Sequence, residues 1–130
     1  GEELLRFDSP VQFSRRIATE PFEIQGVRVE AGEFVMTGLG SANRDPAKFG
    51  PTADQLDLGR PDAREHVSFG SGVHHCLGAA LARRELTVMF EVLADRVDEF
   101  ESTGPIEWGR SNKHTSIRHL PVRVVPKGSS

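Results

Sequence analysis

The residues with the clearest chemical potential surround Cys76, the single cysteine in a chain of 130 residues. Gly70 and Gly72 precede it, Gly78 follows it, and the spacing of apolar residues predicts a helix from 79 to 93. Free backbone N–H groups and the dipole at the start of a helix favour a thiolate over a thiol. Cys76 is therefore predicted to be either a nucleophile or a metal ligand.

Three kinds of chemistry are open to such a thiolate. A nucleophile needs a histidine base, and His74 and His75 are too close in sequence to serve, which leaves the histidines at 66, 114 and 119. Structural zinc needs four ligands at paired spacings, which adjacent histidines do not supply. A haem thiolate needs one cysteine, glycines that admit a flat macrocycle, an aromatic shield such as Phe69, and cations for the propionates. The loop favours this third alternative, and the other two stay open.

The overall composition is that of a folded domain, with 37% hydrophobic and 27% charged residues. A net charge of −3 argues against general nucleic-acid binding. No run approaches the ~18 apolar residues of a membrane span, and one cysteine excludes an internal disulfide, so we expect a cytoplasmic protein. The chain opens at Gly1 inside a helical pattern without an initiator Met or a cap, and we therefore expect a piece of a longer protein.

The rest of the sequence predicts the elements that must position the cysteine loop. Alternating apolar and polar residues after Pro10 predict a small antiparallel sheet with a tight hairpin turn at Gln25-Gly26. Arg15 and Arg16 are neighbours on its first strand and so point to opposite faces. In order, the predicted elements are the end of a helix at 1–7, strands within 11–36, a long coil at 49–67, the loop, the helix at 79–93, and short strands at 106–109 and 120–125.

The loop sequence FGSGVHHCLG, residues 69–78, resembles the haem-binding signature of the cytochrome P450 monooxygenases of the soluble bacterial type. Residues 3–6, ELLR, are similar to the family's Glu-x-x-Arg helix motif, and residues 42–49 and 56–61 resemble the two ends of its meander. The resemblance covers essentially the whole chain. It implies the C-terminal, haem-ligand part of a P450 domain, an α+β piece of a mainly α fold, without the N-terminal and central helices.

The resemblance also implies which residues bind the cofactor, haem b. Cys76 would be the axial thiolate ligand of the iron, and Phe69 would pack beside the sulfur. Gly70 and Gly78 would let the backbone come close to the macrocycle. The haem propionates would be contacted by two cationic side chains, His74 and Arg15.

The Glu-x-x-Arg pair would serve the scaffold rather than the chemistry. Glu3 and Arg6 would be buried and would anchor the meander. The family's third partner of this pair, usually Arg or His, aligns with Gln55, whose amide brings no charge. Loss of one partner from a buried charged network costs about 3–5 kcal/mol, so we expect compensation, with Arg60 as the candidate.

The implied activity is insertion of one oxygen atom of O2 into an organic substrate with electrons from a redox partner. The expected contacts to a small hydrophobic substrate are Val11, Phe13 and His114. A basic patch near the cysteine would steer a ferredoxin-type electron donor to the proximal face. Its expected members are Arg60, Arg64, Arg83 and Arg84. Without the distal helix that relays protons, we expect the piece alone to be inactive; the alternative is a non-catalytic haem-binding or interaction fragment.

Overall fold

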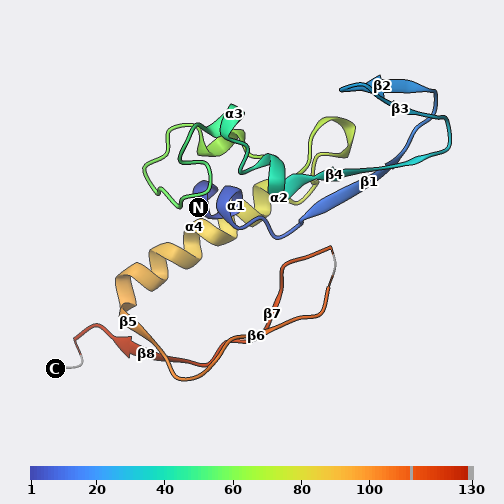
Figure 1. The fold of residues 1–130 in the computed structure, drawn as a ribbon. Helices are drawn as coiled ribbons and strands as arrows, with labels where there is room; N and C mark the ends of the chain where they lie inside the picture. Colours follow the sequence, from blue (N-terminus) through green and yellow to red (C-terminus); the bar gives the residue numbers. More distant parts are fainter. Residues whose placement is uncertain (112, 129–130) are drawn as a thin grey trace.

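Short antiparallel ribbons, a meander and one long helix make up the fold in Figure 1. The computed structural model describes residues 1–111 and 113–128. Its helices are α1 (Glu2–Phe7), α2 (Leu39–Ala42), α3 (Pro46–Phe49) and α4 (Ala79–Arg96), with 3-10 turns η1 (Ala63–Glu65) and η2 (Gly72–His74). Its strands are β1 (Phe13–Ile17), β2 (Phe22–Ile24), β3 (Val27–Val29), β4 (Phe34–Gly38), β5 (Val97–Ser102), β6 (Glu107–Trp108), β7 (Ile117–His119) and β8 (Val122–Pro126).

Two separate ribbons form where the sequence predicts one small sheet. β1 pairs with β4, and β2 pairs with β3, each pair antiparallel and two-stranded. The β2–β3 turn is at Gln25 and Gly26, as predicted, and both residues have positive φ, 49° and 78°. Positive φ at both central residues matches the right-handed twist of a two-residue hairpin. The β1–β4 ribbon extends away from α1 and carries the β2–β3 hairpin at its far end (Figure 1).

The helix after the cysteine loop is longer than its apolar spacing predicts. α4 continues to Arg96, and the chain becomes extended at Val97, where β5 begins. The sequence does not predict β5, because this strand is defined by its pairing with the distant β8. No helix within the described residues combines the length and apolar character needed to cross a bilayer.

The C-terminal arm returns to the start of β1. β6 pairs with β7, and the connection between them reaches Val11, which forms an isolated antiparallel bridge with His114. Two backbone hydrogen bonds flank this bridge, from Gln12 N–H to Lys113 C=O at 2.9 Å and from Thr115 N–H to Pro10 C=O at 2.9 Å. Segments from both ends of the chain are thereby held side by side.

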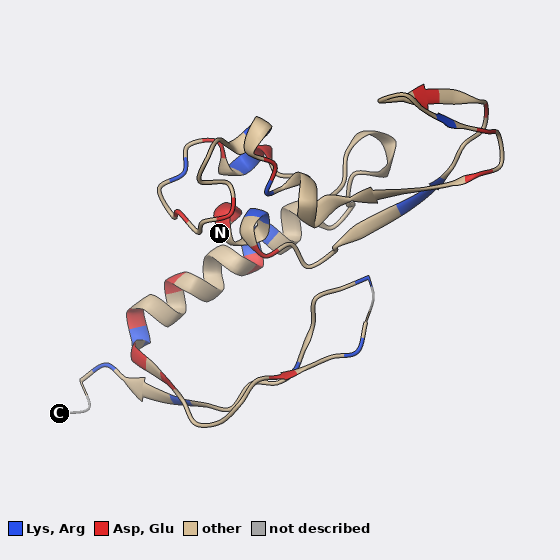
Figure 2. Ribbon diagram, in the orientation of Figure 1, with Lys and Arg blue, Asp and Glu red and all other residues tan. Residues whose placement is uncertain are grey.

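The best-buried region is a polar core around α1, where Figure 2 shows charges of both signs close together. Arg6 is 0% exposed and Glu3 is 4% exposed. Arg6 Nε and Nη2 donate to the two Glu3 carboxylate oxygens at 2.6 and 2.7 Å. The remaining Arg6 donors reach the backbone carbonyls of Asn43, Ala53 and Gln55 at 2.6, 2.7 and 3.0 Å. One buried ion pair therefore fixes the path of the meander.

Arg60 occupies the third position of this network, and the expectation for the Gln55 side chain is wrong. Arg60 Nε donates to Glu3 Oε1 at 3.3 Å, whereas Gln55 contributes its backbone carbonyl and is exposed. The other Arg60 donors reach the carbonyls of Phe49 and Thr52 at 2.8 and 2.7 Å. Arg60 therefore supplies the positive charge that the Gln55 amide lacks. Because Arg60 is only 9% exposed, it is not part of an exposed basic patch.

Candidate functional site

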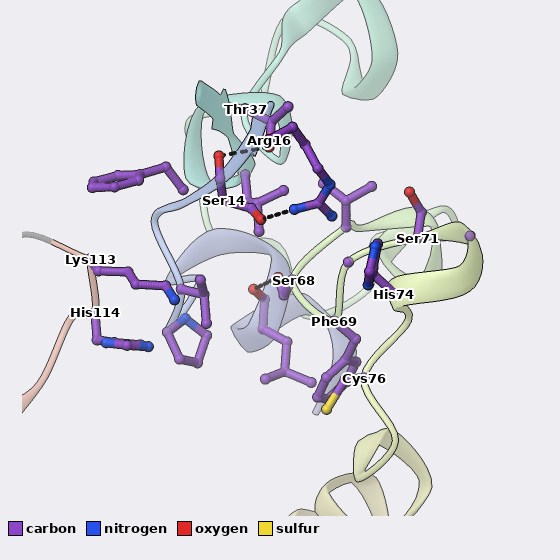
Figure 3. Close-up of a pocket in the computed structure, with 18 of the residues that line it drawn as sticks. Ser14, Arg16, Thr37, Ser68, Phe69, Ser71, His74, Cys76, Lys113 and His114 are labelled. Carbon is purple, nitrogen blue, oxygen red and sulfur yellow. Dashed lines mark hydrogen bonds between the residues drawn. The ribbon is translucent and has the colours of Figure 1, made fainter. Parts of the chain in front are cut away.

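A pocket of about 740 Å³ lies beside the cysteine loop. Its wall combines most of the loop from Val67 to Cys76, six residues between Leu5 and Arg16, Thr37 and Leu39, and the pair Lys113-His114 (Figure 3). The three residues expected to contact substrate all line it: Val11, Phe13 and His114. A concave space bounded by distant segments, with apolar and cationic side chains together, has the size and character of a small-molecule site.

The cysteine loop owes its shape to glycine. Gly70 and Gly72 have φ of 69° and 62°, a backbone conformation that costs glycine little. The loop closes through a hydrogen bond from Cys76 N–H to Phe69 C=O at 2.8 Å. α4 starts directly afterwards with Gly78 as its N-cap residue, where a Cβ would contact Cys76 Sγ at 3.9 Å. Cys76 is exposed at the pocket wall, and Figure 3 shows its sulfur beside the Phe69 ring.

The two non-haem alternatives for Cys76 find little support in this geometry. Among the described residues, no group of three or more His, Cys, Asp and Glu side chains could hold a metal ion, so a zinc site lacks its ligands. In the same part of the chain, no hydrogen bond joins Cys76 Sγ to a histidine. Both ring nitrogens of His66 are already bonded, to Glu2 at 2.9 Å and to the Ser68 N–H at 3.1 Å.

Arg16, Lys113 and His74 line the pocket, whereas Arg15, the residue expected to contact the propionates, does not. The Arg15 guanidinium stacks on the Phe34 ring at 4.6 Å and does not line the pocket. Arg16 does line it, and its Nη1 donates to Ser14 Oγ at 2.6 Å. The reason is the alternation of β1, which turns neighbouring side chains to opposite faces. Figure 3 shows Arg16 reaching toward the loop that carries His74.

Arg83 is only partly available as a surface charge, although the sequence places it in the basic patch. Its Nε donates to Glu2 Oε1 at 2.8 Å, and its guanidinium lies over the Phe69 ring at 4.7 Å. Its side chain is 38% exposed. Arg64 and Arg84 are exposed, so they are the members of the expected patch that face solvent.

Asn43 and Ser68 are two buried residues of the site region that the sequence does not single out. Asn43 Oδ1 accepts from Val67 N–H at 2.8 Å, and its Nδ2 donates to Ser68 Oγ at 2.7 Å. Ser68 Oγ in turn donates to the Leu5 carbonyl at 2.6 Å. These bonds tie α1, the meander and the cysteine loop together. The sequence ANRDP at residues 42–46 marks the start of the meander, but it does not indicate that the Asn43 side chain bonds to the cysteine loop.

The sequence model of the family described as cytochrome P450 matches residues 2–101. The chain belongs to the cytochrome P450 family. Cytochrome P450 126 of Mycobacterium tuberculosis is 47% identical over 123 residues, which are 95% of this chain and 29% of that protein. Linalool 8-monooxygenase of Pseudomonas putida is 41% identical over 125 residues, which are 96% of this chain and 30% of that enzyme. The chain thus spans less than a third of the length of these P450 relatives.

Solved P450 structures share the fold closely. The crystal structure of P450 OxyD has a TM-score of 0.89 and 41% identity, covering 97% of this chain and 32% of OxyD. Substrate-free CYP150A6 of Mycobacterium marinum has a TM-score of 0.90 and 34% identity, covering 98% of this chain and 33% of its own. The resemblance seen in the sequence and the predicted fold class, an α+β piece of the P450 fold, are both confirmed.

The cofactor of the P450 family is haem, as the resemblance implies. The residues of the pocket fit such a group. A thiol stands at the wall beside the Phe69 ring, and two left-handed glycines let the backbone come close without a Cβ. Arg16 supplies a guanidinium and His74 an imidazole at the same wall, and both are donors suited to carboxylates such as the propionates.

Proposed function

We propose that this chain forms the proximal side of a haem-thiolate monooxygenase site, with Cys76 as the axial ligand. The observation that carries the proposal is the exposed Cys76 at the wall of a pocket of about 740 Å³, in a chain of the P450 family. When bound, haem supplies one-electron and O2 chemistry, and an axial thiolate pushes electron density toward the iron in favour of O–O cleavage.

The chain's own residues bind and orient in this proposal. Cys76 provides the thiolate at the start of α4, where backbone N–H groups stabilise negative charge. Phe69 lies beside the sulfur and shields one side of it from water. Arg16 and His74 hold the two propionates by charge-assisted hydrogen bonds, with Arg16 in the role that the sequence assigned to Arg15.

The substrate of this site is a small, mainly hydrophobic organic molecule. Val11 and Phe13 present apolar surface to the pocket, and His114 adds one polar group across the bridge to Val11. A substrate with an apolar body and one polar end would complement this wall. The relative named linalool 8-monooxygenase supports the same substrate class.

Electrons reach the site from a ferredoxin-type donor, and the protein acts in the cytoplasm. The exposed cations near α4 that can steer an acidic donor are Arg64 and Arg84. Arg83 contributes less, because its charge is largely matched by Glu2 at 2.8 Å. Reversing the charge of Arg84 should lower the rate of ferredoxin-supported reduction and weaken its salt dependence.

The test is the absorption spectrum of the reduced, carbon monoxide-bound protein after haem loading. A strongly red-shifted Soret band is expected for thiolate ligation, and Cys76→Ser should abolish it. A matched pair of variants tests the propionate contacts: Arg16→Ala should weaken haem retention, and Arg15→Ala should not. A red-shifted band that persists in Cys76→Ser would contradict the proposal. Haem binding without oxidation of any substrate by the ferredoxin-reduced protein would favour the non-catalytic alternative.

A further inference from the structure

Two side chains that do not line the pocket, Arg83 and His66, lie against the Phe69 ring, and a third joins them. Arg83 from α4 stacks over the Phe69 ring at 4.7 Å, and the His66 ring lies 5.8 Å away at an angle of 48°. Glu2 from α1 joins these two residues, since it accepts from Arg83 Nε at 2.8 Å and bonds to His66 Nε2 at 2.9 Å. We call Glu2, His66 and Arg83 the clamp.

The hydrogen bonds of the clamp define the state of its histidine. Ser68 N–H donates to His66 Nδ1 at 3.1 Å, so the ring proton is on Nε2 and points at Glu2. The His66 side chain is 0% exposed, and burial lowers its pKa below the usual value although Glu2 opposes this. The ring is therefore a neutral, oriented donor, and Glu2 is its acceptor.

Glu2 is the member on which both contacts depend. Burial raises its pKa, but hydrogen bonds from Arg83 and His66 outweigh that effect, so its pKa lies below the ordinary value and it stays a carboxylate. A glutamine at this position would turn an NH2 group toward an N–H donor. It could therefore accept from Arg83 or from His66 through its one oxygen, but would lose the other contact.

Phe69 connects the clamp to the sulfur. Its carbonyl accepts from Cys76 N–H at 2.8 Å, and its ring lies beside Cys76 in Figure 3. A shift of the ring therefore changes the screening of the sulfur from water, and a shift of the whole residue also changes the hydrogen bond of the cysteine backbone. Both effects alter how well negative charge is stabilised on sulfur.

We propose that Glu2 is a positioning residue, which holds Arg83 and His66 against Phe69 and thereby tunes the electron affinity of iron ligated by Cys76. The inference rests on the proposed function, because it requires Cys76 as the iron ligand. Glu2 acts through the clamp and touches neither the sulfur nor the pocket. Its effect therefore depends on the aromatic ring that it positions.

The experiment compares variants of the haem-loaded protein at one fixed reductant potential. Glu2→Gln should keep the red-shifted carbon monoxide band and change the ratio of reduced to oxidised protein by ~3-fold, on the scale of a partly exposed ion pair. Arg83→Lys keeps the charge but loses the flat stacking group, and should act in the same direction. Glu65→Gln is the matched control, since this exposed neighbour of His66 pairs with Lys48 and should leave the ratio unchanged.

A double-mutant cycle separates positioning from general stability. In a Phe69→Leu background, Glu2→Gln should have no further effect on the ratio, because the ring that it positions is gone. A full effect in that background, or an unchanged ratio in both Glu2→Gln and Arg83→Lys, would overturn the inference. If Glu2→Gln fails to take up haem, Arg83→Lys decides alone. A missing red-shifted band in the unmodified protein would overturn the proposed function as well, so the two failures are distinguishable.

Discussion

Replacing Arg60 by alanine should destabilise the protein by about 3 kcal/mol, whereas replacing Gln55 should be nearly neutral. The two positions compete for the third place beside Glu3 and Arg6. The family motif aligns that place with Gln55, with Arg60 as the compensating candidate, and in the structure Arg60 occupies it. The pair of variants therefore tests the structure directly.

The magnitude follows from what each side chain contacts. Arg60 is 9% exposed and donates to Glu3 at 3.3 Å and to the carbonyls of Phe49 and Thr52 at 2.8 and 2.7 Å. Loss of a buried charged partner costs about 3–5 kcal/mol. The lower end applies because Thr52 is exposed and water can replace one bond. Gln55→Ala keeps the carbonyl that Arg6 uses at 3.0 Å and should stay within about 0.5 kcal/mol.

Urea unfolding at neutral pH, followed by far-ultraviolet circular dichroism, measures both effects on the haem-loaded protein. A difference of 3 kcal/mol corresponds to ~100-fold in the folding equilibrium constant, well outside experimental error. Arg60→Lys is an informative third variant, because it keeps the charge but cannot reach three acceptors in one plane. Equal losses for Gln55→Ala and Arg60→Ala would refute the reasoning.

Three further predictions concern acid stability, cofactor retention and the buried amide. Hydrogen bonds from Arg6 lower the pKa of Glu3 from 4.5 to about 2, so its contribution of about 3 kcal/mol is full above pH 4.5 and is lost as the pH falls toward 2. The urea concentration at the unfolding midpoint should fall steeply as the pH is lowered across that range, and less steeply in Glu3→Gln. Parallel curves of midpoint against pH for the two proteins would contradict this. Arg16→Ala should speed haem transfer to apomyoglobin ~10-fold relative to Arg15→Ala, and equal rates would exclude the Arg16 contact. Asn43→Ala should cost about 2 kcal/mol in urea unfolding because two buried groups lose their partner, and a neutral effect would show that the amide is dispensable.

The features that the sequence predicts well are those decided by neighbouring residues. The turn at Gln25-Gly26 needs positive φ at both positions, and the local alternation of residues defines the strands on either side. The cysteine loop likewise carries its own glycines, and its signature identifies the family. α4 follows from an apolar stripe at helical spacing, although its last turn extends beyond that stripe.

The features that the sequence misses depend on contacts between distant residues. Two consecutive arginines on β1 are equivalent in the sequence, and only the packing of β1 shows that Arg16 faces the pocket. β5 has an acidic sequence that could continue a helix, and its pairing with β8 makes it a strand. The sequence names both Gln55 and Arg60 as candidates for the third place beside Glu3, and only the folded meander shows that Arg60 reaches the carboxylate.

The identity of the iron ligand is the central claim, and X-ray absorption at the iron edge tests it most directly. The chain has few sulfur atoms that could compete with Cys76, since Met36 and Met89 hold the only others. The haem-loaded protein should show one sulfur scatterer bound to iron, and Cys76→Ser should remove that scatterer while leaving the four nitrogen scatterers of the porphyrin. Absence of sulfur in the unmodified protein, or its persistence in Cys76→Ser, would contradict the account.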